Sequence, residues 1–506
     1  MNKKRILLGI FVAVASLAVL ITLFSSFYFP VQADETDVAW VAKQVSMGRI
    51  PYADFFSFIP PGALYLLGSY FRLTGPSLGA LRLLTILLLV VMTLILYLLF
   101  TRRGLHYGWA VPAALSVPCI YLPFWPVPSH HWFAMTFGLA ALLVLDREEN
   151  ATSGWLNGGI LVGMSGMCLQ TEGLFFFLFC LPLLFFDSNG RKGKKALVYC
   201  AGTAFPAILF SIILLISGAF GWAVYDIIKW PARFYKQVGG FNDINPIIFI
   251  GNQMLALIPK NLTPGSLAPL FLFIVALIVP LSAIFLPAFS PGWFSPEGKR
   301  ASARWVTSSW GLFLVFAIYL RGRADWTHLC MWTPVLLLMT VRVIDWDSEK
   351  IRPALFKAWL VAVLIIISIR WPMVWVKEPP LIHKVMEVDA ISARHGLPAI
   401  LNEIPGAKER GEPIIYLGKA GSALYFYWAP VPPPLDWIMP PSSRYNSRWE
   451  YGILSDFARK NRIPWIAIPV RYYKAFTEEP SAVSSLLKSD YILFKQTGLG
   501  VIYKRK

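Results

Sequence analysis

Long apolar runs recur along this chain, and short polar stretches separate them. Each run approaches the ~20 residues that a helix needs to cross the hydrocarbon core of a bilayer. The runs are uniformly apolar, whereas the strands of a membrane β-barrel alternate apolar and polar positions. The pattern therefore predicts a polytopic α-helical membrane protein with about 11 transmembrane helices. The predicted spans are 6–29, 78–100, 108–124, 131–145, 156–171, 172–187, 196–220, 266–289, 304–320, 328–344 and 355–374.

The first span follows a basic start, Met1-Asn2-Lys3-Lys4-Arg5, which is also typical of a signal peptide. Its apolar stretch is too long for a signal peptide, and Ala33-Asp34-Glu35 is a poor cleavage site. We therefore expect an uncleaved first helix whose N-terminus lies in the cytoplasm.

Composition narrows the class of protein. Apolar residues make up 56% of the 506 residues and charged residues only 15%, whereas a soluble protein carries about 25% charged residues. An ordinary soluble enzyme, a disordered chain and a disulfide-stapled domain are excluded. The cysteines lie in or beside apolar segments without metal-type spacing, so we expect them to be buried small apolar residues. They are Cys119, Cys168, Cys180, Cys200 and Cys330.

The net charge is +18, from 46 Lys and Arg against 28 Asp and Glu. The chain has no nucleic-acid motif and no low-complexity basic tail, so we expect no nucleic-acid partner. Basic residues instead collect in alternate loops, as they do on the cytoplasmic side of membrane proteins. These groups are Arg102 with Arg103, Arg147, 191–195, 299–304 and 350–352. The alternation places the C-terminus outside the cytoplasm, in a protein integral to the plasma or inner membrane.

The composition changes at about residue 375. Short β-type runs lie at 413–418, 464–470, 490–495 and 500–504, with helical patterns at 449–462 and 480–488. Strands that alternate with helices predict a small α/β domain. We therefore divide the chain into a transmembrane part, 1–374, and a soluble extracytoplasmic domain, 375–506.

The first outer loop, 30–77, carries its own helical pattern. Apolar residues recur at helical spacing between Glu35 and Met47, which predicts an amphipathic helix along the membrane surface. Gly48 is expected to end this helix. Pro60-Pro61 then opens a second short helix, about 62–74, which Gly75-Pro76 stops. The two helices are expected to be interfacial or re-entrant.

Polar side chains border the apolar spans on the predicted outer face. Each one alone is more typical of a solvated helix end, an interfacial histidine or a lipid headgroup contact. Together they place carboxylates, imidazoles and guanidinium groups at one membrane level, which suits chemistry on an anionic lipid. They are Asp34, Glu35, Asp54, His130, His131, Gln170, Glu172, Arg321, Arg323 and His328.

The start of the chain resembles a known family. Asp34-Glu35 is followed by Gly48-Arg49-Ile50-Pro51-Tyr52-Ala53-Asp54-Phe55, then by Pro60-Pro61, Gly75 and Arg82-Leu83-Leu84. This order resembles the opening of the GT-C membrane glycosyltransferases, in particular the protein O-mannosyltransferase and lipid A aminoarabinose transferase group. Looser agreement continues through Arg323, His328 and the C-terminal domain.

The resemblance implies an inverting enzyme that moves a sugar from a polyprenyl-phosphate carrier to an extracytoplasmic acceptor, which is a glycan, a lipid or a protein. The family's acidic pair falls on Asp34 and Glu35. We expect Asp34 to act as the base, and Glu35 to position it or to bind the sugar. Asp54 is expected to bind acceptor or sugar, or to orient a basic partner.

The donor phosphate gains charge as it leaves, and cations held there lower the barrier. Arg321 and Arg323 suit this role, with His328 as a hydrogen-bond donor. No Gly-rich phosphate loop precedes a helix, so a nucleotide-sugar donor is disfavoured. Members of the superfamily differ in metal dependence, which leaves a divalent metal open.

Two other classes of function remain open. A transporter or flippase of a lipid-linked or anionic substrate also needs buried charges, but these usually lie at the bilayer midplane and often within inverted repeats. The sequence shows neither feature. A non-catalytic envelope assembly protein would use the outer domain as a binding module.

Overall fold

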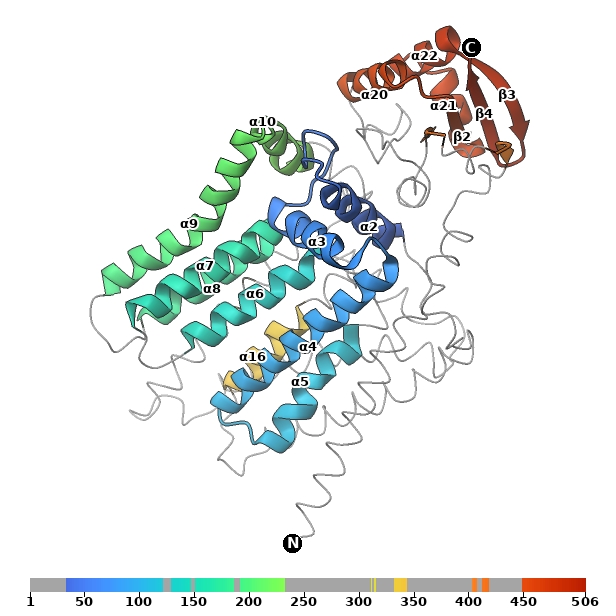
Figure 1. The fold of residues 1–506 in the computed structure, drawn as a ribbon. Helices are drawn as coiled ribbons and strands as arrows, with labels where there is room; N and C mark the ends of the chain where they lie inside the picture. Colours follow the sequence, from blue (N-terminus) through green and yellow to red (C-terminus); the bar gives the residue numbers. More distant parts are fainter. Residues whose placement is uncertain are drawn as a thin grey trace, which may run out of the picture. The chain divides into compact units, whose positions relative to one another are not determined.

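The computed structural model describes residues 33–121, 129–146, 151–185, 192–232, 311, 314, 332–343, 403–406, 412–417 and 448–506. These residues are mostly helical, with one small sheet (Figure 1). They fall into two compact units. The first takes in 82–209 and 332–343, and the second takes in 33–81, 210–232 and the described residues from 403 onward.

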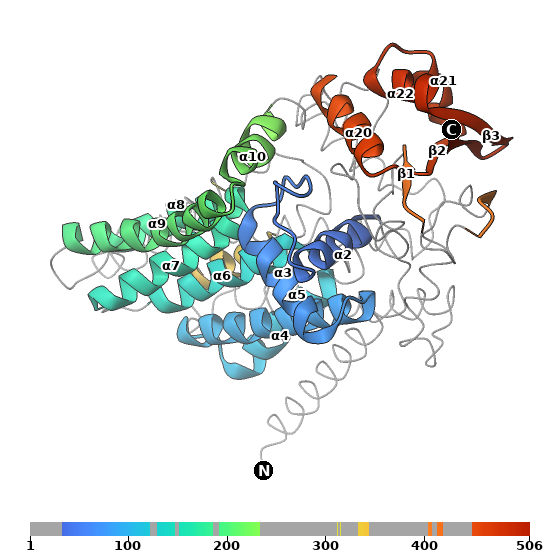
Figure 2. The same cartoon turned by 45° about the horizontal axis from the view of Figure 1, so that its top comes forward.

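The first unit is built from helices, and each predicted span between 78 and 220 carries one of them. Figures 1 and 2 show α6, α7 and α8 side by side. The helices are α4 (Leu78–Arg102), α5 (Tyr107–Tyr121), α6 (His130–Leu145), α7 (Thr152–Cys168), α8 (Gln170–Phe185), α9 (Lys192–Ile216) and α16 (Thr333–Val343). The spans predicted at 6–29, 266–289 and 355–374 lie outside the described residues.

Two of the described helices, α4 and α9, are long and apolar enough to cross a membrane by length and composition. Each carries exposed apolar side chains, such as Leu94 on α4 and Ile212 on α9. An apolar stripe that faces outward suits contact with lipid rather than water. The total of eleven crossings and their orientation stay predictions.

The cysteine prediction is partly wrong. Cys168 and Cys180 are buried, as expected, but Cys200 is exposed. It lies on α9 between the exposed residues Leu197 and Phe205. An apolar helix that faces outward exposes its small residues too, so the apolar neighbourhood of Cys200 did not imply burial.

An ion pair ties the ends of α4 and α6 together. The Arg103 Nε donates to Asp146 Oδ2 at 2.6 Å, and Arg102 donates to the Leu143 carbonyl at 2.5 Å. Both helices therefore end at the same side of the first unit, and His131, at the start of α6, lies at the opposite side.

Glycines bring α7 and α9 into close contact. Gly159 and Gly163 are four residues apart on α7, so they share one face of the helix. A Cβ at Gly159 would fall on the Tyr199 carbonyl oxygen, and one at Gly163 on the Thr203 carbonyl oxygen, both far inside contact distance. Small residues at this spacing let the backbones of two membrane helices approach closely.

We expect Gly159→Ala to destabilise the protein by about 1–3 kcal/mol, because a methyl group here meets backbone, which cannot rotate away. Alanine otherwise favours a helix over glycine by roughly 1 kcal/mol. Gly193→Ala on α9 is the matched control, since nothing lies within 4 Å of its Cβ position. Unfolding of both variants in detergent checks this expectation. A Gly159→Ala variant as stable as Gly193→Ala would contradict it.

In the second unit, the two helices predicted in the first outer loop are present. They are α2 (Ala33–Ser46) and α3 (Pro61–Thr74), and they pack against each other. Gly48 and Gly75 follow them with φ of 84° and 82°, a left-handed conformation that glycine adopts without steric cost. Pro61 occupies the first position of α3, where its missing N–H would have had no helical partner.

The amphipathic pattern expected for α2 is not seen. No described side chain between Glu35 and Ser46 is exposed, and Gln44, on the polar side of the pattern, is fully buried. Helix α3 covers one side of α2, while Phe55 of the following loop meets Trp40 edge-on at 5.5 Å. The helix is therefore a packed element rather than one with a solvated face.

Helix α10 (Phe220–Val224) continues into a π-helical turn, η2 (Tyr225–Lys229). The C-terminal elements are β1 (Ile414–Tyr416), α20 (Arg448–Lys460), β2 (Trp465–Pro469), η8 (Val470–Tyr472), α21 (Tyr473–Thr477), α22 (Ala482–Asp490), β3 (Tyr491–Thr497) and β4 (Gly500–Arg505). The sheet order is β1-β2-β4-β3, with β1 parallel to β2 and the other pairs antiparallel. All four predicted strands and both predicted helices are found here. The domain boundary at 375 lies outside the described residues.

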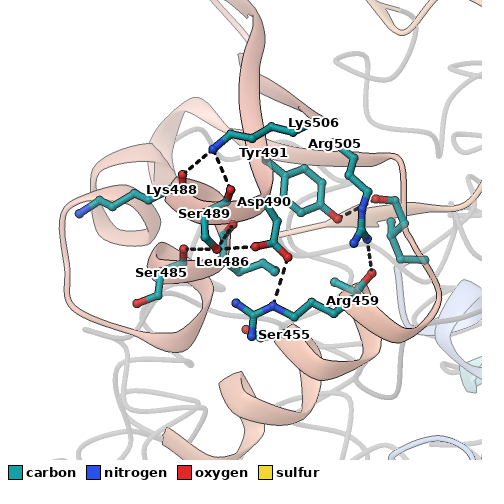
Figure 3. A network of polar contacts seen from close by, with 12 residues as sticks. Ser455, Arg459, Ser485, Leu486, Lys488, Ser489, Asp490, Tyr491, Arg505 and Lys506 are labelled. Atoms are coloured by element: carbon teal, nitrogen blue, oxygen red, sulfur yellow. Dashed lines mark hydrogen bonds and ion pairs between the residues drawn. The ribbon is translucent and has the colours of Figure 1, made fainter.

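Polar contacts join the helices of this segment to each other and to the strands and their connections (Figure 3). Arg459 Nε of α20 donates to Asp490 Oδ2 at 3.1 Å, and the Tyr491 hydroxyl donates to the Ile463 carbonyl at 2.7 Å. Lys506 Nζ donates to the carbonyls of Lys488 and Ser489, at the end of α22. A cation at the C-terminal end of a helix satisfies carbonyls that have no helical partner.

Candidate functional site

Glu35 lies in the first turn of α2 and is only 1% exposed. A charge that simply marks a solvated helix end would be exposed, so this interpretation fails for Glu35. Burying a carboxylate is costly without compensating contacts. The side chain of Asp34, one residue earlier, lies outside the description, and its role stays a prediction.

The loop between α2 and α3 is tightly folded. The Asp54 carboxylate accepts a hydrogen bond from the Ile50 N–H at 2.7 Å, and the Tyr52 N–H donates to the Phe55 carbonyl at 2.9 Å. Asp54 is exposed, so it closes the turn and still faces solvent. A role for Asp54 in binding acceptor or sugar is compatible with this position.

Tyr52 is strained within that loop. Its φ is 71°, a left-handed conformation that costs a bulky residue on the order of 1–3 kcal/mol and is concentrated at functional sites. The buried side chain is held by its hydroxyl, which donates to the Ile59 carbonyl at 2.7 Å. Burial, followed by the charge of Asp226, raises the pKa of Tyr52 well above its ordinary value, so the phenol stays protonated.

Asp226 was missed by the sequence analysis. It lies in the π-helical turn η2, is 3% exposed, and accepts a hydrogen bond from the Ser57 N–H at 3.2 Å. The available signal was a lone acidic residue within the apolar stretch Trp222–Trp230. No local motif linked it to a loop 169 residues away. Isolated π-helical turns frequently accompany functional sites.

In the first unit, His131 and Glu172 form a buried pair. The His131 Nδ1 lies 2.8 Å from Glu172 Oε1, and the two side chains are 12% and 3% exposed. Each stands in the first turn of its helix, α6 or α8, and the Ser129 hydroxyl caps α6 by accepting from the His131 N–H. The sequence placed both residues on outer turns but did not predict that they meet.

The second carboxylate oxygen of Glu172, Oε2, is buried and has no hydrogen-bond partner among the described residues. A buried acceptor of this kind is costly unless a donor reaches it. The His130 ring lies beside that of His131, with centroids 4.5 Å apart. Together they offer an acceptor oxygen and imidazole nitrogens, which are suited to ligand hydroxyls.

Of the remaining predicted site residues, the structure describes Gln170, which is exposed at the start of α8. Arg321, Arg323 and His328 lie outside the described residues. Within the described part of the chain, no group of three or more His, Cys, Asp and Glu gathers as a metal site.

No protein-family model matches the chain, and no curated protein matches it. Several solved structures are similar in fold. The archaeal oligosaccharyltransferase AglB from Archaeoglobus fulgidus, in complex with an inhibitory peptide and a dolichol-phosphate, is 14% identical over 97% of this chain and 74% of its own, with a TM-score of 0.49.

ArnT from Cupriavidus metallidurans, bound to undecaprenyl phosphate, is 14% identical over 98% of this chain and 97% of its own, with a TM-score of 0.42. The arabinofuranosyltransferase AftD from Mycobacteria is 12% identical over 97% of this chain and 40% of its own, with a TM-score of 0.46. All three are GT-C glycosyltransferases, the superfamily that the start of this chain resembles. Each of these TM-scores is below 0.5, so the similarity by itself does not establish a function.

Proposed function

We propose that this protein is an inverting glycosyltransferase that moves a sugar from a polyprenyl-phosphate carrier to an acceptor outside the cytoplasm. The observation that carries the proposal is the acidic pair at the start of α2. Glu35 of this pair is buried, and the pair directly follows a predicted membrane span. It opens the stretch that resembles the GT-C enzymes, and this stretch includes the strained loop at Tyr52.

The proposed reaction is a single displacement. The acceptor hydroxyl oxygen attacks the anomeric carbon, and the bond from that carbon to the carrier's phosphate oxygen breaks. Asp34 takes the proton of the hydroxyl as the new bond forms. The polyprenyl phosphate leaves with the electron pair, so the anomeric configuration inverts. Glu35 positions Asp34 or binds the sugar.

The other candidate residues would bind either the phosphate of the donor or the hydroxyl groups of the substrate. Arg321 and Arg323 would stabilise the phosphate as it gains charge, with His328 as a hydrogen-bond donor. Buried Glu172 Oε2, with the imidazoles of His130 and His131, would receive hydroxyl groups of the substrate. Membrane lipids surround the site, and the acceptor is a glycan, a lipid or a protein.

A deletion strain of the source organism tests the proposal in the cell. Mass spectrometry of its surface glycans and glycolipids should show species that lack one sugar. A plasmid carrying the wild-type gene should restore them, and one carrying Asp34→Asn should not. Full restoration by Asp34→Asn would favour the transporter or assembly alternatives, since neither needs a base.

Donor binding gives a separate prediction. We expect Arg323→Ala to lower the transfer rate by about 10²–10³-fold, the usual effect of removing one donor to developing transition-state charge. Arg323→Lys should recover only part of the rate, because lysine lacks the bidentate geometry of guanidinium. Lys194→Ala, an exposed residue at the other predicted side of the membrane, is the control. Steady-state transfer kinetics measure all three, and unchanged rates in both Arg323 variants would remove this residue from the site.

A further inference from the structure

Two residues of one helical segment hold three consecutive residues of the loop between α2 and α3. Asp226 and Trp230 are four residues apart, about one helical turn. Asp226 accepts the hydrogen bond from the Ser57 N–H. Trp230 contacts the two flanking rings, Phe56 edge-on at 5.0 Å and Phe58 stacked at 5.8 Å. The segment 226–230 thus fixes both the backbone and the side chains of 56–58.

The fixed segment adjoins the strained part of the same loop. Tyr52, with its positive φ, is bonded to the Phe55 and Ile59 carbonyls on either side of 56–58. A conformation of this kind persists only where the surroundings over-determine it. The contacts of Asp226 and Trp230 supply part of that constraint.

The chemistry of Asp226 favours a specific role over plain packing. It is a buried carboxylate whose oxygen meets a backbone N–H, and a charge-assisted hydrogen bond of this type is stronger than a neutral one. An apolar side chain would fill the same space without the cost of burying a charge. A carboxylate kept at this position despite that cost suits a role in holding one geometry of the loop.

We propose that Asp226 is a positioning residue for sugar transfer: through Ser57 and together with Trp230 it holds the 48–59 loop in the shape that presents Asp54 to the acceptor. The proposal rests on the proposed function, because it assigns the loop to acceptor binding. The proposal gives this loop a role toward the acceptor only, whereas Arg321 and Arg323 would bind the donor phosphate.

The test compares Asp226→Ala and Asp226→Asn in the full-length protein, with kinetics measured separately for donor and acceptor. A misplaced group can cost about 10²-fold, so we expect Asp226→Ala to lower kcat/KM for the acceptor by this factor, chiefly through a higher acceptor KM, while the KM for the donor stays unchanged. Asp226→Asn keeps an oxygen for the Ser57 N–H and should recover to within about tenfold. A purely structural defect would instead reduce the active fraction and leave both KM values unchanged.

Trypsin cleavage after Arg49 gives a readout that does not depend on activity. Release of the loop should accelerate this cleavage in Asp226→Ala and much less in Asp226→Asn. Asp146→Asn is the matched control, since Asp146 is also a carboxylate that accepts a hydrogen bond, but its partner is Arg103 and the pair joins α4 to α6. It should change neither the acceptor KM nor cleavage after Arg49.

The outcomes separate the two proposals. An Asp226→Ala protein with wild-type acceptor KM and wild-type cleavage overturns the positioning role. If Asp226→Ala does not fold, Asp226→Asn decides, and an equal rise of the donor and acceptor KM in that variant also overturns the role. Absence of sugar transfer by the wild type would refute the proposed function, while the cleavage assay would still report whether Asp226 holds the loop.

Discussion

Asp34→Asn is expected to insert and fold normally and to transfer sugar about 10²–10⁴ times more slowly than the wild type, the range that a positioned general base contributes. Asparagine keeps the size of the side chain and its hydrogen-bonding oxygen but cannot take the acceptor's proton. Donor binding should largely survive. Single-turnover kinetics of sugar transfer check the expected loss of rate, and a separate donor-binding measurement checks that donor affinity survives.

Glu35→Gln should give a smaller loss of rate, or one dominated by weaker substrate binding. The reverse ranking would move the base to Glu35, which the structure shows to be buried in the same first turn of α2. Asp37→Asn, on the same helix, is the control and should retain the wild-type rate. Wild-type transfer with Asp34 and Glu35 both neutralised would contradict the displacement mechanism.

His131→Ala is expected to destabilise the protein by about 1–3 kcal/mol, because it leaves a buried carboxyl oxygen of Glu172 without its hydrogen-bond partner. Replacing both residues with leucine should cost less than the single change, since no buried polar group of the pair is then left unpaired. A double-mutant cycle, measured by unfolding in detergent, gives the coupling between the two side chains. Thr171→Ala, an exposed neighbour, should lie within about 0.5 kcal/mol of the wild type.

Additive effects in that cycle would contradict a direct His131–Glu172 pair. The kinetics of the double variant address function separately. If Oε2 of Glu172 receives a substrate hydroxyl, the leucine pair should fold and yet bind substrate poorly. A stable leucine pair with wild-type KM values would restrict the pair to a structural role.

Elements with a strong local pattern were predictable from the sequence. The helices α2 and α3 end shortly before Gly48 and Gly75, where a positive φ favours glycine. The four C-terminal strands, which are separated by polar or helical segments, were also found where the pattern placed them. In these cases the signal lies within a few neighbouring residues.

Contacts between distant segments were not predictable in this way. His131 and Glu172 are 41 residues apart, and Ser57 and Asp226 are 169 apart. Periodicity reports which face of an element is apolar, but it does not report which other element covers that face. The same limit explains α2, whose polar side chain Gln44 is fully buried although the spacing suggested a solvated face.

The central claim is that the protein transfers sugar from a polyprenyl-phosphate carrier, and one measurement addresses it directly. The purified protein is placed in vesicles with a panel of polyprenyl-phosphate hexoses and pentoses, radiolabelled in the sugar, and membranes of the deletion strain supply the acceptor. We predict that the label of one donor moves to the acceptor fraction with inverted anomeric configuration, that an equal amount of polyprenyl phosphate is released, and that Asp34→Asn loses nearly all of this activity. No transfer from any donor by the wild type, or equal transfer by Asp34→Asn, would contradict the account.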